Sequence, residues 1–559
     1  MSQLGKTVRA FVHKRERYVP FAIAVLMIPL GLGLFGIAPI FGTVVAVLGL
    51  TGTAMGIYDL NQTHHALMRN YPLASRMRYL LEHFRPEIRQ YFVEDDHAET
   101  PFSREQRAVV YRRAKGIEGV RPFGTLCNVY AEGYEWLNHS LSTTHLPGQD
   151  FRLRVGGPDC KRPYESSVVN ISGMSYGALS PHAIEALNRA AKAGGFAHTT
   201  GEGSISRFHR MGGDLIWQIG SGYFGCRNSD GSFCPARFAE NAADDAVKMI
   251  EIKLSQGAKP GHGGILPGAK VTEAIAEARG VPVGHACVSP SSHSAFSSPR
   301  ELCDFIAQLR QLSDGKPIGV KLCVGHPWEW FAMAKAFHQT GVAPDFIVVD
   351  GAEGGTGAAP VEFADHKGAP LREGLMLVHN TLLGLGIRDR IKVIASGKII
   401  TAFDICRISA LGADGVNMAR GFMFAIGCIQ AQSCHTGMCP TGIATQDPGR
   451  YKALVVPDKA ERAARFHAAT MFALKEACES SGLHHPQEFT PHHLMIRTSP
   501  REVRSAASLY DWLKPGSLLA GEVGHPAFAK YWDEAGIDSW NMTRGSAEAQ
   551  PAMASQEVA

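Results

Sequence analysis

Eight short apolar runs constrain the fold of this chain more than any other feature. From Val168 onward, runs rich in β-branched residues alternate with segments whose apolar residues recur at helical spacing. This alternation is typical of parallel strands joined by crossover helices. The predicted strands are Val168–Ser172, Phe196–Thr200, Met249–Lys253, His285–Val288, Ile318–Cys323, Phe346–Asp350, Lys392–Ala395 and Gly415–Met418.

Eight such units predict an α/β chain with a (β/α)8 barrel, also called a TIM barrel. A doubly wound sheet is the alternative, but it would normally carry a glycine fingerprint after its first strand. The segment Gly173–Gly177 does not have that form. We therefore expect the barrel over residues 161–450, with helical additions.

The rest of the 559 residues divides by composition. Residues 1–58 are predicted to form a basic segment and a transmembrane hairpin, and residues 59–160 a helical adaptor. Residues 451–540 are predicted to be a helical extension. Residues 541–559 are rich in Ser, Ala and Glu and are expected to be disordered.

The predicted hairpin rests on charge. No charged residue occurs between Arg17 and Asp59, a run of 41 positions. A membrane helix needs about 20 apolar residues, so the run accommodates two, with a turn at Gly36–Pro39. A signal peptide would have a shorter apolar core, and a buried helical pair of a soluble core is the remaining alternative. The flanking basic residues are Lys6, Arg9, Lys14, Arg15 and Arg17 before the run and Arg69, Arg76 and Arg78 after it.

Basic residues at both ends of the run predict that both ends, and the catalytic domain, are cytoplasmic. The chain as a whole has a net charge of +4 and a pI near 8.4. That charge is too mild to indicate nucleic-acid binding, and we expect no such partner.

One segment gathers three of the twelve cysteines. Cys428, Cys434 and Cys439 follow the spacing C-x5-C-x4-C, whereas the other nine are scattered singly. The scatter suits a reducing compartment. Thiolates select iron–sulfur clusters, zinc or copper(I). The spacing favours a cluster, while zinc with a fourth ligand from elsewhere and three structural cysteines remain alternatives.

The residues around these cysteines add a resemblance. Gly412–Gly421 precedes them, His435 and Thr436 lie among them, and Thr441–Gln446 completes the motif Cys-Pro-Thr-Gly-Ile-Ala-Thr-Gln. The segment resembles the three-iron, four-sulfur (3Fe–4S) segment of glutamate synthases. Over roughly residues 168–446, the chain is similar to the FMN-binding glutamate synthase domain family. The resemblance implies a barrel, FMN and a 3Fe–4S cluster held by the three cysteines.

The predicted barrel mouth offers groups for a flavin. Barrels often bind phosphate after the seventh and eighth strands, where Gly397 leaves backbone N–H groups accessible and Lys398 and Arg420 add positive charge. Lys321 is expected to stabilise the reduced flavin anion, and Gln256 to hydrogen-bond the ring edge. Plain turns and an ion-paired lysine are the alternatives. The expected cofactor-binding residues are Ser175, Gln256, Lys321, Asp350, Gly355, Thr356, Gly397, Lys398, Arg420 and Gly421.

A dicarboxylate such as 2-oxoglutarate needs two cationic anchors. Lys253, Lys259 and Arg279 lie on or after the third predicted strand. The resemblance implies that these residues contact 2-oxoglutarate and that Glu202 is a further substrate-site residue. Charges at helix ends are the alternative for Lys253 and Arg279. We expect Lys321 and Glu202 to be the catalytic residues.

The sequence also departs from the family pattern. His262 and Ile265 stand where the larger enzymes commonly have Glu and Gln, which removes a polar contact to the substrate. Residue 2 is Ser and the first cysteine is Cys127, so no glutaminase is expected. No G-x-G-x-x-G opens a helix after a strand, so no NAD(P)H site is evident. A separate electron partner is expected, such as ferredoxin or a membrane redox component.

These features favour an oxidoreductase acting on CH–NH2 donors, which reductively aminates 2-oxoglutarate to glutamate with electrons relayed from the cluster to FMN. Three alternatives remain. They are an amino-acid or N-alkyl amino-acid oxidoreductase, a membrane-bound flavin and iron–sulfur electron carrier, and a binding protein without cofactors.

Overall fold

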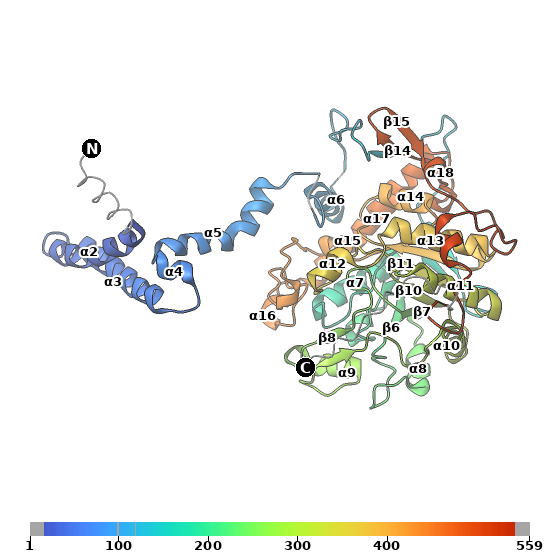
Figure 1. The fold of residues 1–559 in the computed structure, drawn as a ribbon, viewed down its shortest axis with the longest axis horizontal. Coiled ribbons are helices and arrows are strands. Elements are labelled where there is room, and N and C mark those ends of the chain that lie inside the picture. Colours follow the sequence, from blue (N-terminus) through green and yellow to red (C-terminus); the bar gives the residue numbers. More distant parts are fainter. Residues whose placement is uncertain (1–15, 98–99, 118, 543–559) are drawn as a thin grey trace, which may run out of the picture. The chain divides into compact units, whose positions relative to one another are not determined.

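The computed structural model describes residues 16–97, 100–117 and 119–542 (Figure 1). By its internal contacts the chain divides into two units, residues 1–104 and residues 105–559. Each unit is considered by itself. The predicted basic residues before Glu16 and nearly all of the predicted disordered tail lie outside the described residues.

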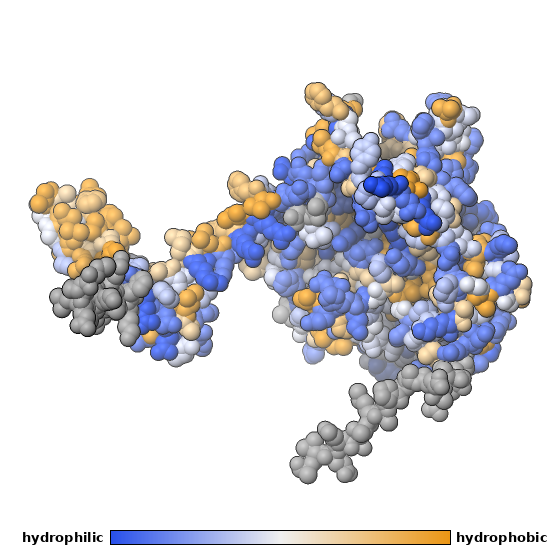
Figure 2. All heavy atoms as spheres, turned by 45° about the horizontal axis from the view of Figure 1, so that its top comes forward, coloured by the Kyte–Doolittle hydropathy of each residue, from blue (hydrophilic) through white to orange (hydrophobic). Residues whose placement is uncertain are grey.

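The first unit is helical. A 3-10 turn over Glu16–Tyr18 leads into helix α2 (Val19–Leu34), and α3 (Pro39–Asn61) follows after a short turn. Both are long and apolar enough to cross a membrane, a test that core helices and signal sequences also pass. A core helix is mostly buried, but only 11% and 17% of these two windows are buried. Figure 2 shows the pair covered with hydrophobic side chains.

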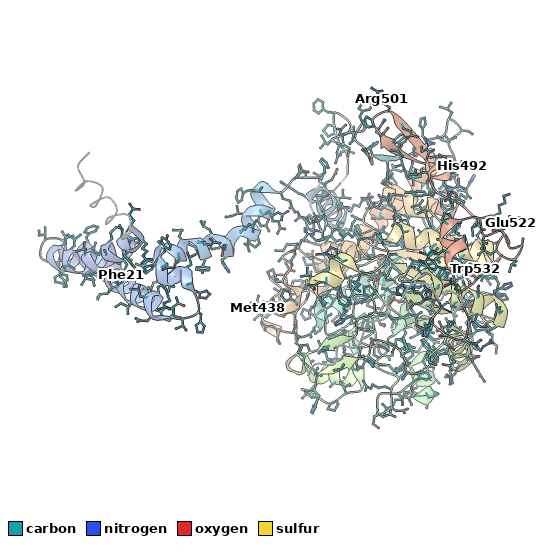
Figure 3. The ribbon with its side chains drawn as sticks, in the orientation of Figure 1. Phe21, Met438, His492, Arg501, Glu522 and Trp532 are labelled. Carbon is teal, nitrogen blue, oxygen red and sulfur yellow. The ribbon has the colours of Figure 1, made fainter. Side chains whose placement is uncertain are left out.

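Helices α2 and α3 pack closely because glycines line their contact. A Cβ atom at Gly31 would lie 2.4 Å from Ala46 N, and one at Gly56 would lie 2.1 Å from the ring of Phe21, which is labelled in Figure 3. Small residues allow this approach of two backbones, as in membrane helix pairs. The predicted pair of apolar helices with a turn between them is thus present.

A partly buried ion pair ties α3 to the helices that follow. After α4 (Ala66–Asn70) comes α5 (Ala74–Ile88), which continues as a π-helical turn over Arg89–Val93. Arg76 donates to both carboxylate oxygens of Asp59, at 3.0 and 2.6 Å. Asp59 is fully buried, and the pair therefore fixes the end of α3 against the start of α5.

The second unit contains the predicted barrel. Eight parallel strands close in the order β10-β11-β12-β13-β4-β5-β6-β7, as the strand pairings show. Their residues are nearly all buried, because barrel strands are covered by side chains inside and by helices outside. The strands are β4 (Val169–Ile171), β5 (His198–Thr199), β6 (Leu215–Ile219), β7 (Val247–Lys253), β10 (Ile318–Leu322), β11 (Phe346–Asp350), β12 (Lys392–Ser396) and β13 (Gly415–Met418).

One predicted barrel strand was wrong and one was missed. The run His285–Val288 contributes to β9 (Cys287–Ser289), which pairs antiparallel with β8 (Gly264–Leu266) in a separate hairpin. The missing strand is β6, in which Trp and Gln interrupt the β-branched pattern. It is completely buried, and Trp217 stacks on Phe238. The predicted third strand is therefore the fourth barrel strand, β7.

Helices connect the strands and cover the barrel (Figure 1). Several begin with a Pro at the first positions after a capping side chain, such as Ser180 and Ser298, which accept backbone N–H bonds. Between the barrel strands lie α7 (Pro181–Gly194), α8 (Pro235–Ala242), α9 (Glu273–Arg279), α10 (Pro299–Leu312), α11 (Pro327–Thr340), α12 (Val361–His366), α13 (Leu371–Gly384) and α14 (Ala402–Ala410). After β13 come α15 (Arg420–Ala425), α16 (Pro448–Tyr451) and α17 (Val456–Ser480).

The sequence predicted helical segments before and after the barrel. Both segments contain strands as well as helices. The predicted adaptor includes α6 (Arg104–Ala114) but also β1 (Glu135–Leu137) and β2 (Arg152–Val155), which pairs with β3 (Tyr164–Ser167). The C-terminal segment adds β14 (Leu494–Ser499), β15 (Glu502–Ser505), α18 (Ala506–Leu509) and α19 (Pro526–Tyr531).

Strands β1, β14 and β15 form one antiparallel sheet, with Glu135 opposite Ile496. Strand β14 alternates buried Leu494 and Ile496 with more exposed residues, which is the period of a half-buried strand rather than of a helix. The sheet joins residues far apart in sequence on one side of the barrel.

Candidate active site at the barrel mouth

Charged side chains converge where β10 and β11 end. Lys321 is buried, and its Nζ lies 3.5 Å from Asp350 Oδ2. Burial alone would lower the pKa of Lys321, but the carboxylates of Asp350 and Glu251 outweigh it and raise that pKa. Lys321 therefore stays cationic inside the barrel. Asp350 also accepts the Gly257 N–H at 2.8 Å, which fixes the loop after β7.

Two further polar residues of this cluster were not predicted. Gln218 on β6 donates from Nε2 to Glu251 Oε1 on β7, and both residues are buried. Burial raises the pKa of Glu251, and its Oε2 has no hydrogen-bond partner among the described residues. An unpartnered buried oxygen is costly, so it marks a place for a ligand or water. The signal available in the sequence was an acidic residue inside the apolar run Met249–Lys253.

The predicted substrate residues lie in an adjoining pocket. Lys253 Nζ donates to Glu202 Oε2 at 3.1 Å and to Gln256 Oε1 at 2.9 Å. Lys259 lines the same pocket, as do Glu202 and Gln256. The positive charge of Lys253, aided by Lys259 and Arg279, overcomes burial and lowers the pKa of Glu202. Burial lowers the pKa of Lys259, and Glu202 opposes that effect.

Arg279 lies beside this pocket rather than in its wall. It ends helix α9, is buried, and donates from Nη2 to Tyr176 O at 3.1 Å. Its guanidinium group lies 4.9 Å from the centroid of the Phe224 ring, and its Nε has no partner among the described residues. Burial lowers the pKa of Arg279. The alternative of a surface charge is wrong for both Arg279 and Lys253, because both are largely buried.

Of the two residues that depart from the family pattern, only His262 shares the pocket with Lys253 and Lys259. His262 is in the pocket wall, and its ring packs edge-on against Phe363 at 5.2 Å. Ile265 on β8 is 69% exposed and does not line the pocket. Its side chain therefore replaces no polar contact inside the pocket.

The loops after β12 and β13 carry the residues that were predicted to bind phosphate. Lys398 has φ +47°, a left-handed conformation that is uncommon for a residue other than glycine and concentrates at functional sites. Arg420 opens α15, and its Nη2 donates to Thr356 O at 3.0 Å. A Cβ atom at Gly355 would lie 3.1 Å from Arg420 Nε, so a larger residue there would crowd this guanidinium group.

Of the remaining predicted cofactor residues, Ser175 and Gly397 lie on neighbouring loops and Gly421 lies in a helix. Ser175 follows β4, and a Cβ atom at Gly201 would lie 2.5 Å from its backbone nitrogen. Gly397 follows β12 and has φ +157°. Gly421 is buried in α15 and faces the ring of Phe466. Ser175 and Gly397 therefore border the mouth, whereas Gly421 contacts the helical layer.

The three cysteines after α15 lie close enough to influence one another. Burial raises the pKa of Cys428, and the other two thiols add to the effect while Arg420 opposes it. At Cys439 burial acts in the same sense, but hydrogen bonds from Ala444, Thr441 and Ile443 outweigh it and lower the pKa. Donors aimed at sulfur favour the thiolate, which is the form that binds metal.

Among the described residues, the three thiols do not form a group compact enough to hold one zinc ion as they stand. The Sγ atoms of Cys428, Cys434 and Cys439 do not all lie within 4.8 Å of one another among the described residues. One tetrahedral zinc would hold its thiolates about 4 Å apart. Arg420 also links this segment to the mouth, because its Nη1 lies 3.9 Å from Cys434 Sγ. Met438, labelled in Figure 3, is 60% exposed, so the segment reaches the surface.

A closed (β/α)8 barrel with buried ionised groups at the carboxyl ends of its strands defines the class of barrel enzymes. The family described as "Conserved region in glutamate synthase" matches residues 160–484. This chain belongs to that family, as the resemblance in its sequence predicted.

Two relatives and one solved structure illustrate the similarity. The chain is 37% identical over 482 residues to the glutamate synthase large subunit-like protein YerD of Bacillus subtilis, covering 79% of this chain and 91% of that protein. It is 37% identical over 319 residues to the archaeal-type glutamate synthase (NADPH) of Thermotoga maritima, and it spans 59% of that protein's length. A mandelate oxidase variant with (S)-mandelic acid superposes with a TM-score of 0.39 at 14% identity, over 71% of this chain and 98% of that one.

Proposed function

We propose that this chain is an FMN-dependent oxidoreductase of the glutamate synthase type, which reductively aminates 2-oxoglutarate to glutamate. The observation that carries the proposal is the pocket shared by Lys253, Lys259 and Glu202 beside the buried Lys321. Membership of the glutamate synthase family supports the same reaction class.

When bound, FMN supplies two-electron transfer to carbon and a 3Fe–4S cluster supplies single electrons. The residues that would hold the FMN phosphate are Gly397, Lys398 and Arg420. Lys321, kept cationic by Asp350 and Glu251, would favour the reduced flavin anion. Cys428, Cys434 and Cys439 would ligate the cluster.

The pocket supplies the substrate chemistry. Lys253 and Lys259 offer two ammonium groups for the two carboxylates of 2-oxoglutarate. Ammonia adds to the ketone carbon and water leaves, which gives an imine. Its reduction needs two electrons and a proton at carbon and a second proton at nitrogen. Glu202, held ionised by Lys253, would accept a hydrogen bond from the incoming nitrogen at Oε1 and so orient it.

The electron route and the membrane anchor are part of the proposal. Arg420 contacts both the loop after β11 and Cys434, and therefore joins the proposed flavin and cluster sites. Electrons would come from a separate partner, such as ferredoxin or a membrane redox component. Helices α2 and α3 would anchor the chain, with the barrel in the cytoplasm.

One observation favours a second candidate function. His262 lines the pocket and brings an imidazole to a position where the larger enzymes commonly have a carboxylate. An amino-acid or N-alkyl amino-acid oxidoreductase would use the same cations with a different side-chain pocket. An electron carrier without substrate turnover would not need the cations at all.

Anaerobic purification in detergent tests the proposal. We expect a flavin absorbance spectrum, iron and acid-labile sulfide, and reoxidation of the reduced protein by 2-oxoglutarate with ammonium, yielding glutamate. The variant Cys434→Ser should lose iron and retain flavin. A colourless protein would refute the proposal. Reoxidation only by other oxo acids, or reduction of the oxidised flavin by an amino acid or N-alkyl amino acid, would support the second candidate.

A further inference from the structure

A cavity separate from the candidate active site lies among the loops that follow β5, β6 and β7. Its volume is about 400 Å³, which is within the usual size of small-molecule sites, about 300–1,000 Å³. Among the described residues that line it, Glu277 is the only acidic one. The cavity wall contains four arginines, Arg207, Arg210, Arg227 and Arg237.

The positive charge of this cavity is only partly compensated, by Asp244, by Glu277 in the wall and by Asp230, whose pKa Arg227 helps to lower. Arg210 forms an ion pair with Asp244. The Arg207 and Arg227 guanidinium groups lie over phenylalanine rings, 5.0 and 5.4 Å from the centroids. Arg237 donates to the backbone carbonyl of Arg227 at 2.8 Å. Within the described part of the chain, none of these last three has a carboxylate at ion-pair distance. Clustered cations in a concave site attract anions.

The lining indicates the class of anion. Guanidinium groups bind phosphate oxygens through paired N–H donors, and Ser204 and Ser206 add hydroxyl groups to the wall. No aromatic residue lines the cavity among those described, so no ring there offers a stacking surface for a nucleobase. We propose that the cavity binds a compact, multiply charged phosphate compound from solution, such as pyrophosphate or a small phosphorylated metabolite.

The cavity shares two chain segments with the candidate active site. The loop after β5 carries Glu202 and then, at the cavity, Arg207, with buried Ser204 between them at φ +70°. Helix α9 carries Glu277 in the cavity wall and Arg279 beside the substrate pocket. An anion that moves either segment changes the surroundings of Glu202. Binding at the two sites is therefore coupled, and the coupling is reciprocal.

Calorimetric titration of the full chain in detergent with inorganic pyrophosphate tests the binding. We expect saturable binding at one site, weakened about tenfold or more in the double variant Arg227→Gln with Arg237→Gln, because each loses charge-assisted hydrogen bonds. The matched control is Arg462→Gln with Arg465→Gln on α17, which removes the same charge from exposed ion pairs. Its affinity should equal that of the unmodified chain.

Several results would overturn the proposal. They are no saturable binding of pyrophosphate, equal weakening in both double variants, or binding only to phosphatidylglycerol vesicles and not to pyrophosphate. Thermal unfolding of each variant checks its fold, and Arg227→Lys, which keeps the charge but not the paired donors, should bind with intermediate affinity.

The coupling rests on the proposed function, whereas the binding does not. Pyrophosphate should change the KM for 2-oxoglutarate in the unmodified chain and have no effect in the double cavity variant. Calorimetric binding without any such change would refute the coupling alone. Absence of turnover would count against the proposed function and leave the binding result intact.

Discussion

The barrel strands and the helix pair α2–α3 are both rich in apolar residues, but they differ in how far these residues are exposed. The strands are buried within the protein, whereas the helices are not. In the barrel, every residue of β6, β10 and β11 is buried. In the helix pair, Leu26 and Leu32 are about two-thirds exposed. Apolar surface is stable only when it is removed from water. The barrel does this with its own side chains, whereas the helix pair needs another apolar phase, which we propose is the bilayer.

The largest effect expected from this comparison follows from deleting residues 1–61. The remaining chain should stay in solution without detergent, because the apolar helices are gone and the barrel encloses its own core. Centrifugation and light scattering in detergent-free buffer would measure this. Aggregation of the shortened chain, with the barrel still folded by circular dichroism, would contradict the proposed anchor.

Lys321→Met should damage the barrel most among single substitutions. It leaves the carboxylates of Asp350 and Glu251 buried without their cation, which costs about 3–5 kcal/mol in comparable cases. Denaturant unfolding of the second unit would show the loss. Arg372→Met is the control for a half-exposed cation, and equal effects of the two variants would show that burial is not what matters.

A matched pair of leucine substitutions tests the comparison directly. Leu215→Ala on β6 removes a fully buried side chain and should cost about 2–5 kcal/mol of unfolding free energy. Leu32→Ala on α2 removes a side chain that is 67% exposed and should leave the unfolding of the barrel unchanged. Thermal unfolding in detergent measures both. A large effect of Leu32→Ala on the unfolding of the barrel would contradict the claim that only the barrel side chains stabilise the barrel.

The smallest effect concerns pH. The pKa of Glu202 is lowered in the folded protein, chiefly by Lys253, so its contribution to stability is present above its unfolded pKa and is lost as pH falls through the folded value. Glu202→Gln should therefore lose less stability than the unmodified chain on acidification. Denaturant unfolding at neutral and acidic pH would show this. Parallel pH profiles would mean that Glu202 is not ionised against Lys253.

The sequence predicted the architecture well because β-branched residues recur in several barrel strands, most clearly in β11 and β12. Strand β6 was not predicted because Trp217 and Gln218 interrupt its β-branched pattern. Only the burial of the whole strand in the barrel identifies it. The run at His285–Val288 has the apolar composition of a strand, but only tertiary contacts decide that it forms a hairpin with β8.

The candidate site was predictable in part. Residues next to glycines at strand ends, such as Lys398, were identified because parallel strands present their carboxyl ends at one face. Glu251 was missed because its importance arises from burial and from Gln218 across the strand pair. Arg279 was assigned to the substrate, but its guanidinium group turns to the Tyr176 carbonyl, a contact set by the path of the backbone.

The left-handed backbone at Lys398 limits which residues can replace it. Glycine and asparagine adopt this conformation readily, whereas valine, isoleucine and threonine resist it because of their branched Cβ. In a saturation library at this position, the ability of each residue to adopt the left-handed conformation should affect the protein more than the charge of its side chain. Asparagine would preserve the loop conformation while removing the ammonium group. It therefore separates the effect of the backbone conformation from the effect of the charge.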